Sequence, residues 1–224
     1  FSSMQHLAKY IDHTLLKQDA TYAQIETLCQ EAKQYDFMSV CIQPHFVSFA
    51  KQKLVESTVK VCTVIGFPLG QNHRETKVFE TKKAISEGAD EIDMVMNISL
   101  LKAKKFHEIY LEIAEIKYAC SGRILKVILE TCLLTNEEII KACEIAKEAK
   151  ADFVKTSTGF STAGATVEHV RLMKKTVGDK LQVKASGGIR SLTEMQSMIE
   201  AGASRIGTSS GVKILQGQTS QTSY

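Results

Sequence analysis

Short strand-like runs alternate with longer amphipathic stretches along the whole 224-residue chain. The short runs are rich in strand-forming residues, and the stretches between them have apolar positions at helical spacing. Eight runs are predicted to be strands: residues 10–13, 39–42, 59–65, 91–96, 125–130, 153–156, 182–185 and 205–208. Because only two prolines and no low-complexity linker interrupt the alternation, residues 1–224 are expected to form one domain, with a polar tail at 217–224.

Several of the predicted helices have recognisable ends. Residues 135–138 and 191–194 match the capping box, in which a hydroxyl and a carboxylate satisfy free backbone donors. Gly88, Gly178 and Gly202 stand at helix ends, where glycine accepts a left-handed turn. Eight strand–helix units in this length predict a TIM (β/α)8 barrel. The alternative is a doubly wound open sheet, which usually has fewer strands, and no GxGxxG motif opens the first helix.

A weak internal repeat supports the barrel. Residues 88–93, 150–155 and 202–207 align without gaps, and each has a helix end, an alanine and then a strand. In a barrel this register would place Asp93, Lys155 and Gly207 at comparable heights. Polar residues spaced by two also point into a barrel or its mouth. Two strands show this spacing: Lys126, Ile128 and Glu130 in one, and Gln182, Lys184 and Ser186 in the other.

Two of the lysines inside predicted strands share a distinctive context. Lys155 and Lys184 each lie in a short run that ends in small hydroxyl residues and glycine. Burial lowers the pKa of an amine and makes it nucleophilic near neutral pH, and a second cation nearby lowers that pKa further. The pair therefore indicates Schiff-base chemistry, with Lys155 as nucleophile and Lys184 as the neighbouring cation. The alternative is a pair of lysines that point outward between helices or bind phosphate as plain charges.

A carboxylate in a third strand fits the same chemistry. Asp93 stands between Ile92 and Met94, and a buried carboxylate needs a partner or a function. It is a candidate base for a substrate hydroxyl during carbon–carbon cleavage, acting through water. The alternative, compatible with the first, is an ion pair with Lys126 or Lys184 that satisfies both charges. Asp12 is a similar but weaker candidate.

The segments after the last two predicted strands indicate a phosphate site. Both are rich in glycine and hydroxyl residues, and loops at this position in TIM barrels commonly hold phosphate. Ordinary tight turns are the alternative. The residues concerned are Gly187, Gly188, Gly207, Ser209 and Ser210, with Thr158 and Gly159 from the preceding loop. Cys41 lines the pocket or packs in the core, and core packing is favoured.

Composition excludes several classes. The net charge of +3 is dispersed, so no nucleic-acid partner is expected, and no run of 18 apolar residues predicts a membrane span. The six cysteines lack CxxC spacing, which favours reduced thiols and a cytoplasmic protein. The histidines form no HxH or HExxH pattern, so no metal is expected. No signal peptide opens the chain, and Met4 is a candidate native start, with residues 1–3 as a remnant.

These motifs together resemble the 2-deoxyribose-5-phosphate aldolase family of class I aldolases, which are TIM barrels. The resemblance spans nearly the whole chain in unbroken order, and the two lysine motifs are its most specific part. The matching segments are residues 10–16, 40–42, 66–70, 90–95, 125–131, 155–160, 184–190 and 205–211.

The resemblance implies reversible cleavage of 2-deoxy-D-ribose 5-phosphate to D-glyceraldehyde 3-phosphate and acetaldehyde, in deoxynucleoside breakdown, without a metal or organic cofactor. Lys155 would form the Schiff base, and Asp93 and Lys184 would donate and accept protons. Tyr224 matches a terminal tyrosine that reaches the active site in some members, and Phe160 replaces a phosphate-binding lysine. Phosphate binding would then rest on backbone amides, serines and Arg190. The expected substrate-binding residues are Asp12, Cys41, Lys126, Thr158, Gly159, Gly187, Gly188, Gly207, Ser209 and Ser210.

Two other functions remain open. One is a different lysine lyase on the same barrel, such as a transaldolase-like enzyme. The other is a sugar-phosphate-binding barrel without catalysis, which would keep the glycine loops but would need neither Lys155 nor Asp93. The expected partner is a small sugar phosphate, and a homodimer is one of the states that the sequence leaves open.

Overall fold

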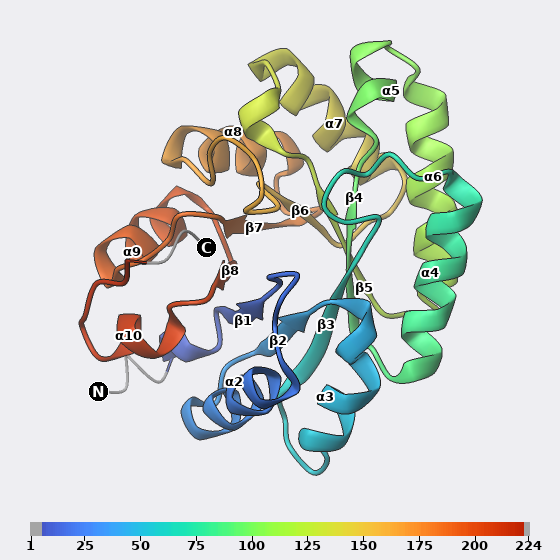
Figure 1. The fold of residues 1–224 in the computed structure, drawn as a ribbon. Coiled ribbons are helices and arrows are strands. Elements are labelled where there is room, and N and C mark those ends of the chain that lie inside the picture. The colour runs from blue at the N-terminus through green and yellow to red at the C-terminus, as the bar shows by residue number, and fades with distance from the viewer. Residues whose placement is uncertain (1–5, 222–224) are drawn as a thin grey trace.

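The computed structural model describes residues 6–221, which form a closed eight-stranded parallel barrel surrounded by helices (Figure 1). Each strand pairs with its neighbours in chain order, and β8 closes the barrel against β1. The predicted TIM barrel is therefore confirmed. The strands are β1 (Ile11–Leu15), β2 (Ser39–Ile42), β3 (Lys60–Ile65), β4 (Glu91–Val95), β5 (Ile124–Ile128), β6 (Phe153–Lys155), β7 (Gln182–Ser186) and β8 (Arg205–Thr208).

Helices follow the strands and pack outside the barrel (Figure 1). No helix within residues 6–221 is long and apolar enough to cross a membrane. The helices are α2 (Tyr22–Tyr35), α3 (Val47–Lys53), α4 (Arg74–Glu87), α5 (Ile98–Lys102), α6 (Phe106–Ala119), α7 (Asn136–Glu148), α8 (Val167–Val177), α9 (Leu192–Ala201) and α10 (Gly211–Leu215), with 3-10 turns η1 (Pro44–Phe46) and η2 (Thr131–Leu133).

The capping predictions hold with one correction. Thr135 and Glu138 form the full capping box of α7. At α9 the Ser191 side chain accepts from the Glu194 backbone, but the Glu194 carboxylate accepts from the Ser191 hydroxyl, so only half of the box is present. The capping box at Thr21, which begins α2, was not predicted.

The eight predicted strands are all present, and the largest correction concerns the end of β5. This strand ends at Ile128, and Glu130 has a left-handed backbone with φ of 58°. Glu130 therefore does not continue the inward face of Lys126 as predicted. Its carboxylate instead accepts from the backbone N–H and the hydroxyl of Thr158, at 3.0 and 2.6 Å. This contact ties the loop after β5 to the loop after β6.

Apolar packing occurs mainly outside the barrel. The larger apolar core fills the layer between strands and helices, as expected where each strand alternates between two faces. Within the barrel, a small apolar cluster of Leu16, Cys41, Cys62 and Val64 packs with Phe67. Buried charged side chains from six of the strands also lie inside the barrel, and they form the candidate site.

Candidate active site

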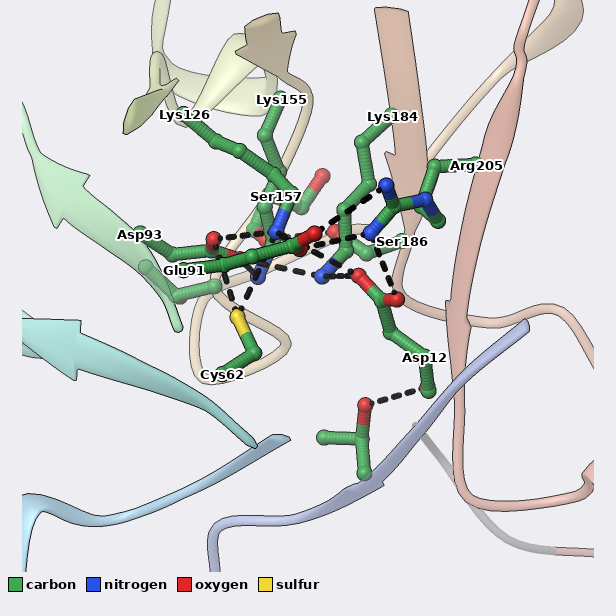
Figure 2. A network of polar contacts seen from close by, with 12 residues as sticks. Asp12, Cys62, Glu91, Asp93, Lys126, Lys155, Ser157, Lys184, Ser186 and Arg205 are labelled. Atoms are coloured by element: carbon green, nitrogen blue, oxygen red, sulfur yellow. Dashed lines mark hydrogen bonds and ion pairs between the residues drawn. The ribbon is translucent and has the colours of Figure 1, made fainter. Parts of the chain in front are cut away.

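Three lysine ammoniums converge on Asp93 inside the barrel (Figure 2). Lys126 donates to Asp93 Oδ1 at 2.9 Å, and both Lys155 and Lys184 donate to Asp93 Oδ2, at 3.1 and 3.0 Å. All four side chains are fully buried. The strands impose this arrangement, because the Cα pairs Asp93–Lys126 and Lys155–Lys184 are in register on neighbouring strands. Both sequence-based interpretations of Asp93 therefore remain compatible, since it is ion-paired and also adjacent to both predicted catalytic lysines.

The electrostatics of Asp93 favour its ionised form. Burial alone raises the pKa of a carboxyl, but the ammoniums of Lys126 and Lys184 outweigh it, with a further contribution from Lys155. The pKa of Asp93 therefore lies well below its usual value. A carboxylate in this state accepts hydrogen bonds from several amines at once.

Lys184 and Lys126 are held as cations. Burial lowers the pKa of Lys184, but Asp12 and Asp93 outweigh burial and hold that pKa well above its usual value. The same balance raises the pKa of Lys126, where Asp93 is the strongest of the opposing charges. An amine that stays protonated cannot attack a carbonyl, so neither group suits the role of nucleophile.

Asp12 joins the cluster from β1, as the sequence suggested. Its Oδ2 accepts from Lys184 at 2.6 Å, and its Oδ1 accepts from Ser39 at 2.7 Å and from Arg205 at 2.9 Å. Burial raises the pKa of Asp12, but Arg205, then Lys184, outweigh it and lower that pKa. Asp12 is thus a partner of Lys184 on the side away from Asp93.

Gly207 lies within β8, as the predicted strand 205–208 has it. A Cβ at this position would lie 2.9 Å from Lys184 Cε, a contact that the sequence did not predict. The absence of a side chain at Gly207 leaves room for the stem of Lys184. Gly187 is also a packing position, because Gly164 from the preceding loop approaches it too closely for either residue to hold a Cβ. Gly188, with φ of 79°, faces open space.

The remaining predicted residues lie at or beyond the carboxyl ends of the strands. Cys41 is buried beside Cys62, and the hydrogen bond between their thiols is the main cause that lowers the pKa of Cys41. Gly159 follows Thr158 at the half-buried start of the next loop, and the Ser210 backbone donates to Thr208 at 3.0 Å. Ser209, in the loop after β8, lines a cavity of about 330 Å³ beside α2. Tyr224 and residues 1–3 lie outside the described residues.

The sequence analysis missed Glu91, Arg205 and Cys62, which are buried in the same network (Figure 2). Glu91 Oε1 accepts from Lys126 at 2.6 Å and from Arg205 at 2.7 Å, and Cys62 donates to Asp93 at 3.2 Å. A usable signal was present, because Glu91 and Asp93 are two residues apart on one strand and so share a face. Arg205 stands in the same relation to Gly207.

Two groups of side chains have the spacing of metal ligands. They are Cys41, Cys62 and Asp93, and Asp12, Cys62 and Glu91. The carboxylates in both groups already pair with ammonium or guanidinium groups, and a divalent cation placed among these would be repelled by them. The donor sets therefore fit a lysine–carboxylate centre better than a metal centre.

The fold and the site together define a (β/α)8 barrel with a buried centre of lysines and carboxylates. Residues 6–217 match the sequence model of a protein family described as "DeoC/LacD family aldolase". The chain belongs to this family of aldolases, which makes it a lyase.

Known proteins similar to this chain align with it over nearly its full length. The deoxyribose-phosphate aldolase of Carboxydothermus hydrogenoformans is 59% identical, over 99% of each chain. Deoxyribose-phosphate aldolase 1 of Vibrio vulnificus is 60% identical, over 95% of this chain and 97% of that protein. The solved deoxyribose phosphate aldolase of Aeropyrum pernix, described as tetrameric, matches with a TM-score of 0.90 at 37% identity, covering 96% of this chain and 92% of that one.

Proposed function

We propose that this chain is a 2-deoxyribose-5-phosphate aldolase that works through a Schiff base on Lys155. The observation that supports this most is the shared acceptor: Lys155 and Lys184 both donate to Asp93 Oδ2 in a fully buried site. Two amines that both contact one carboxylate can provide a nucleophile, an acid and a base next to one another. Relatives at up to 60% identity are deoxyribose-phosphate aldolases, which supports the choice of substrate.

The division of roles follows from the charges. Lys184 is held as a cation by Asp12 and Asp93, so it is suited to donate a proton rather than to attack carbon. Lys155, the last residue of β6, stands at the carboxyl end of the barrel, where TIM-barrel enzymes bind their substrates. Lys155 is therefore the nucleophile of this proposal.

The reaction then balances as follows. The neutral amine of Lys155 adds to aldehyde carbon C1 of the open sugar phosphate, and the carbinolamine takes up one proton and loses one water to leave an iminium. Asp93, directly or through a water, takes the proton of the C3 hydroxyl. The C2–C3 bond breaks, its electron pair passes to the iminium to give an enamine, and D-glyceraldehyde 3-phosphate leaves. Lys184 supplies the proton that converts the enamine back to an iminium, and the proton held by Asp93 returns to Lys184 across their hydrogen bond. One water then hydrolyses the iminium and releases acetaldehyde, the neutral amine of Lys155 and the proton taken up at the start.

Arg190 supports a phosphate subsite in the loop between β7 and α9. Its Nε is buried and has no hydrogen-bond partner within residues 6–221. A buried donor without a partner is costly, and an anion would satisfy it. Phe160 cannot provide a cation, and its ring packs edge-on against Phe67 at 5.4 Å. We therefore assign the phosphate to the loops after β7 and β8, with Gly188 and Arg190 from the first loop and Ser209 from the second.

Reductive trapping tests the proposed function. The protein is treated with acetaldehyde and borohydride, which converts an imine to a stable N-ethyl lysine, and its peptides are mapped. We expect the modification on Lys155 and competition by 2-deoxyribose 5-phosphate. A protein that binds this sugar phosphate but gains no adduct on Lys155 would instead be a binding barrel.

Replacing Arg190 tests the phosphate subsite separately. In Arg190→Met the KM for 2-deoxyribose 5-phosphate should rise about 10- to 100-fold, since a hydrogen bond to a charged group contributes about 1.5–3 kcal/mol. Turnover of unphosphorylated 2-deoxyribose, which has no phosphate to lose contact with, should not change. Arg123→Met is a matched control, because Arg123 precedes β5 at the opposite end of the barrel and its guanidinium donates to the backbone carbonyls of Cys120 and Ser121. Equal losses on both sugars would place Arg190 outside the phosphate subsite.

A further inference from the structure

Arg205 donates hydrogen bonds to two carboxylates near the predicted catalytic lysines. It is the first residue of β8, and its Nη1 donates to Asp12 Oδ1 at 2.9 Å and to Glu91 Oε1 at 2.7 Å. The guanidinium also lies over the Phe153 ring, 5.1 Å from its centroid. Arg205 and Glu91 are both buried, so this contact is shielded from solvent.

Each of these carboxylates is connected to Asp93 through one lysine. On one side Asp12 accepts from Lys184, which donates to Asp93 Oδ2. On the other side Glu91 accepts from Lys126, which donates to Asp93 Oδ1. The result is a closed ring of six alternating charges, hereafter the charge ring (Figure 2). Its members in order are Arg205, Asp12, Lys184, Asp93, Lys126 and Glu91.

The charge ring is formally neutral, with three cations and three carboxylates. Lys155 attaches to it at Asp93 Oδ2 and is not one of its six members. Any change of charge in the ring therefore alters the potential at Lys155 through a buried, poorly screened medium. Three members do not contact Asp93 directly: Glu91 is linked to it through Lys126, Asp12 through Lys184, and Arg205 through either carboxylate. Of these three, Arg205 and Glu91 have no direct link to either Asp93 or Lys184.

We propose that Arg205 and Glu91 are positioning residues that close the charge ring, hold Lys126 and Lys184 on opposite oxygens of Asp93, and keep the potential at Lys155 balanced. The role rests on the proposed function of Lys155 as a nucleophile. Without Arg205, the carboxylates of Asp12 and Glu91 would repel each other. Their contacts with Lys184 and Lys126, and so the positions of both amines on Asp93, would become less well defined. Without the Glu91 charge, Lys126 would keep only Asp93, at 2.9 Å, and the more distant Asp12, at 3.6 Å, as carboxylate partners among the described residues.

The other groups around Lys155 bear on any pH effect. They come from the strands that enclose it, and none of them is replaced in the variants below. They are Asp12 from β1, Cys41 from β2, Cys62 from β3, Asp93 from β4, Lys126 from β5 and Lys184 from β7.

Variants that change the charge of the ring by one unit in opposite senses test the proposal. Reductive methylation with formaldehyde and cyanoborohydride, quantified at Lys155 by peptide mapping over a pH series, reports amine reactivity without requiring aldolase activity. In Arg205→Met the added negative potential favours the ammonium, so methylation at a fixed pH should fall about tenfold. In Glu91→Gln it should rise about tenfold, equivalent to one pH unit. In the double variant Arg205→Met/Glu91→Gln and in the conservative variant Arg205→Lys, the ring keeps its net charge. The pH profile of Lys155 methylation should therefore be close to that of the protein without substitutions.

The buried pair Lys77 and Glu112 provides the matched control. Lys77 donates to Glu112 at 2.7 Å between α4 and α6, outside the barrel. Lys77→Met and Glu112→Gln should lower the melting temperature without moving the Lys155 profile. If the two ring variants shift the profile in the same direction, or only lower the melting temperature as the control does, the role is structural and the proposal is overturned. Failure of acetaldehyde trapping in the unmodified protein would instead overturn the proposed function.

Discussion

Lys155→Arg should abolish aldolase activity while the protein stays folded. The guanidinium keeps the charge that faces Asp93 but cannot form an imine, because it does not lose its proton at accessible pH. Loss of a covalent nucleophile is expected to lower kcat/KM by about 10⁴- to 10⁶-fold. The measurement is retro-aldol turnover of 2-deoxyribose 5-phosphate, with the melting temperature as a check on folding.

Lys184→Arg is the informative comparison. It should still give the borohydride-trapped adduct on Lys155, although turnover falls, because this proposal gives Lys184 a proton-transfer role. Adduct formation on Lys184 in Lys155→Arg, with retained turnover, would reverse the two roles. The pair of variants thus separates the amine that bonds to the substrate from the amine that moves protons.

Asp93→Asn should cause the second largest loss. The amide cannot serve as a base, and it leaves Lys126, Lys155 and Lys184 without the carboxylate that they share. Loss of general base catalysis is expected to lower kcat by about 10²- to 10⁴-fold. Breaking a buried ion pair from one side typically costs about 3–5 kcal/mol, so the free energy of unfolding should also fall. Turnover and chemical denaturation measure the two effects independently.

Asp90→Asn is the matched control on the same segment. Asp90 precedes β4 and accepts from the Val61 backbone at 2.8 Å and from Lys51 at 3.3 Å, at the amino end of the barrel. Its replacement should leave kcat unchanged. If Asp93→Asn lowers stability but keeps full turnover, Asp93 serves only as the counter-charge of the lysines, which was the alternative interpretation of its place in the strand.

Most of the fold was predictable because barrel strands are short, regular and separated by capped helices. The eight strands were located to within about two residues at each end. The errors arose where local backbone geometry overrides pattern. Glu130 continues the alternation of Lys126 and Ile128, yet its left-handed φ turns its side chain toward Thr158. Nothing in the alternation of side chains encodes that turn.

The sequence predicted several residues of the site, but it predicted fewer of the contacts between them. Lys155, Lys184 and Asp93 stand out because charged residues in apolar strands are costly and require partners. Gly207 was assigned to phosphate because it stands near a glycine-rich loop, and its close packing against Lys184 was not predicted. That packing depends on the distance between two strands rather than on any local pattern.

By itself the sequence determined the barrel, the inward-facing lysines and the carboxylate in the fourth strand, since periodicity and the cost of buried charge act within single segments. The charge ring was decided only by the tertiary structure. Arg205 and Asp12 are separated by 193 positions, and Arg205 and Glu91 by 114. They meet because closure of β8 against β1 directs one face of every strand into the same enclosed volume. Which charge faces which is then a property of strand register, and register is fixed only when the barrel closes.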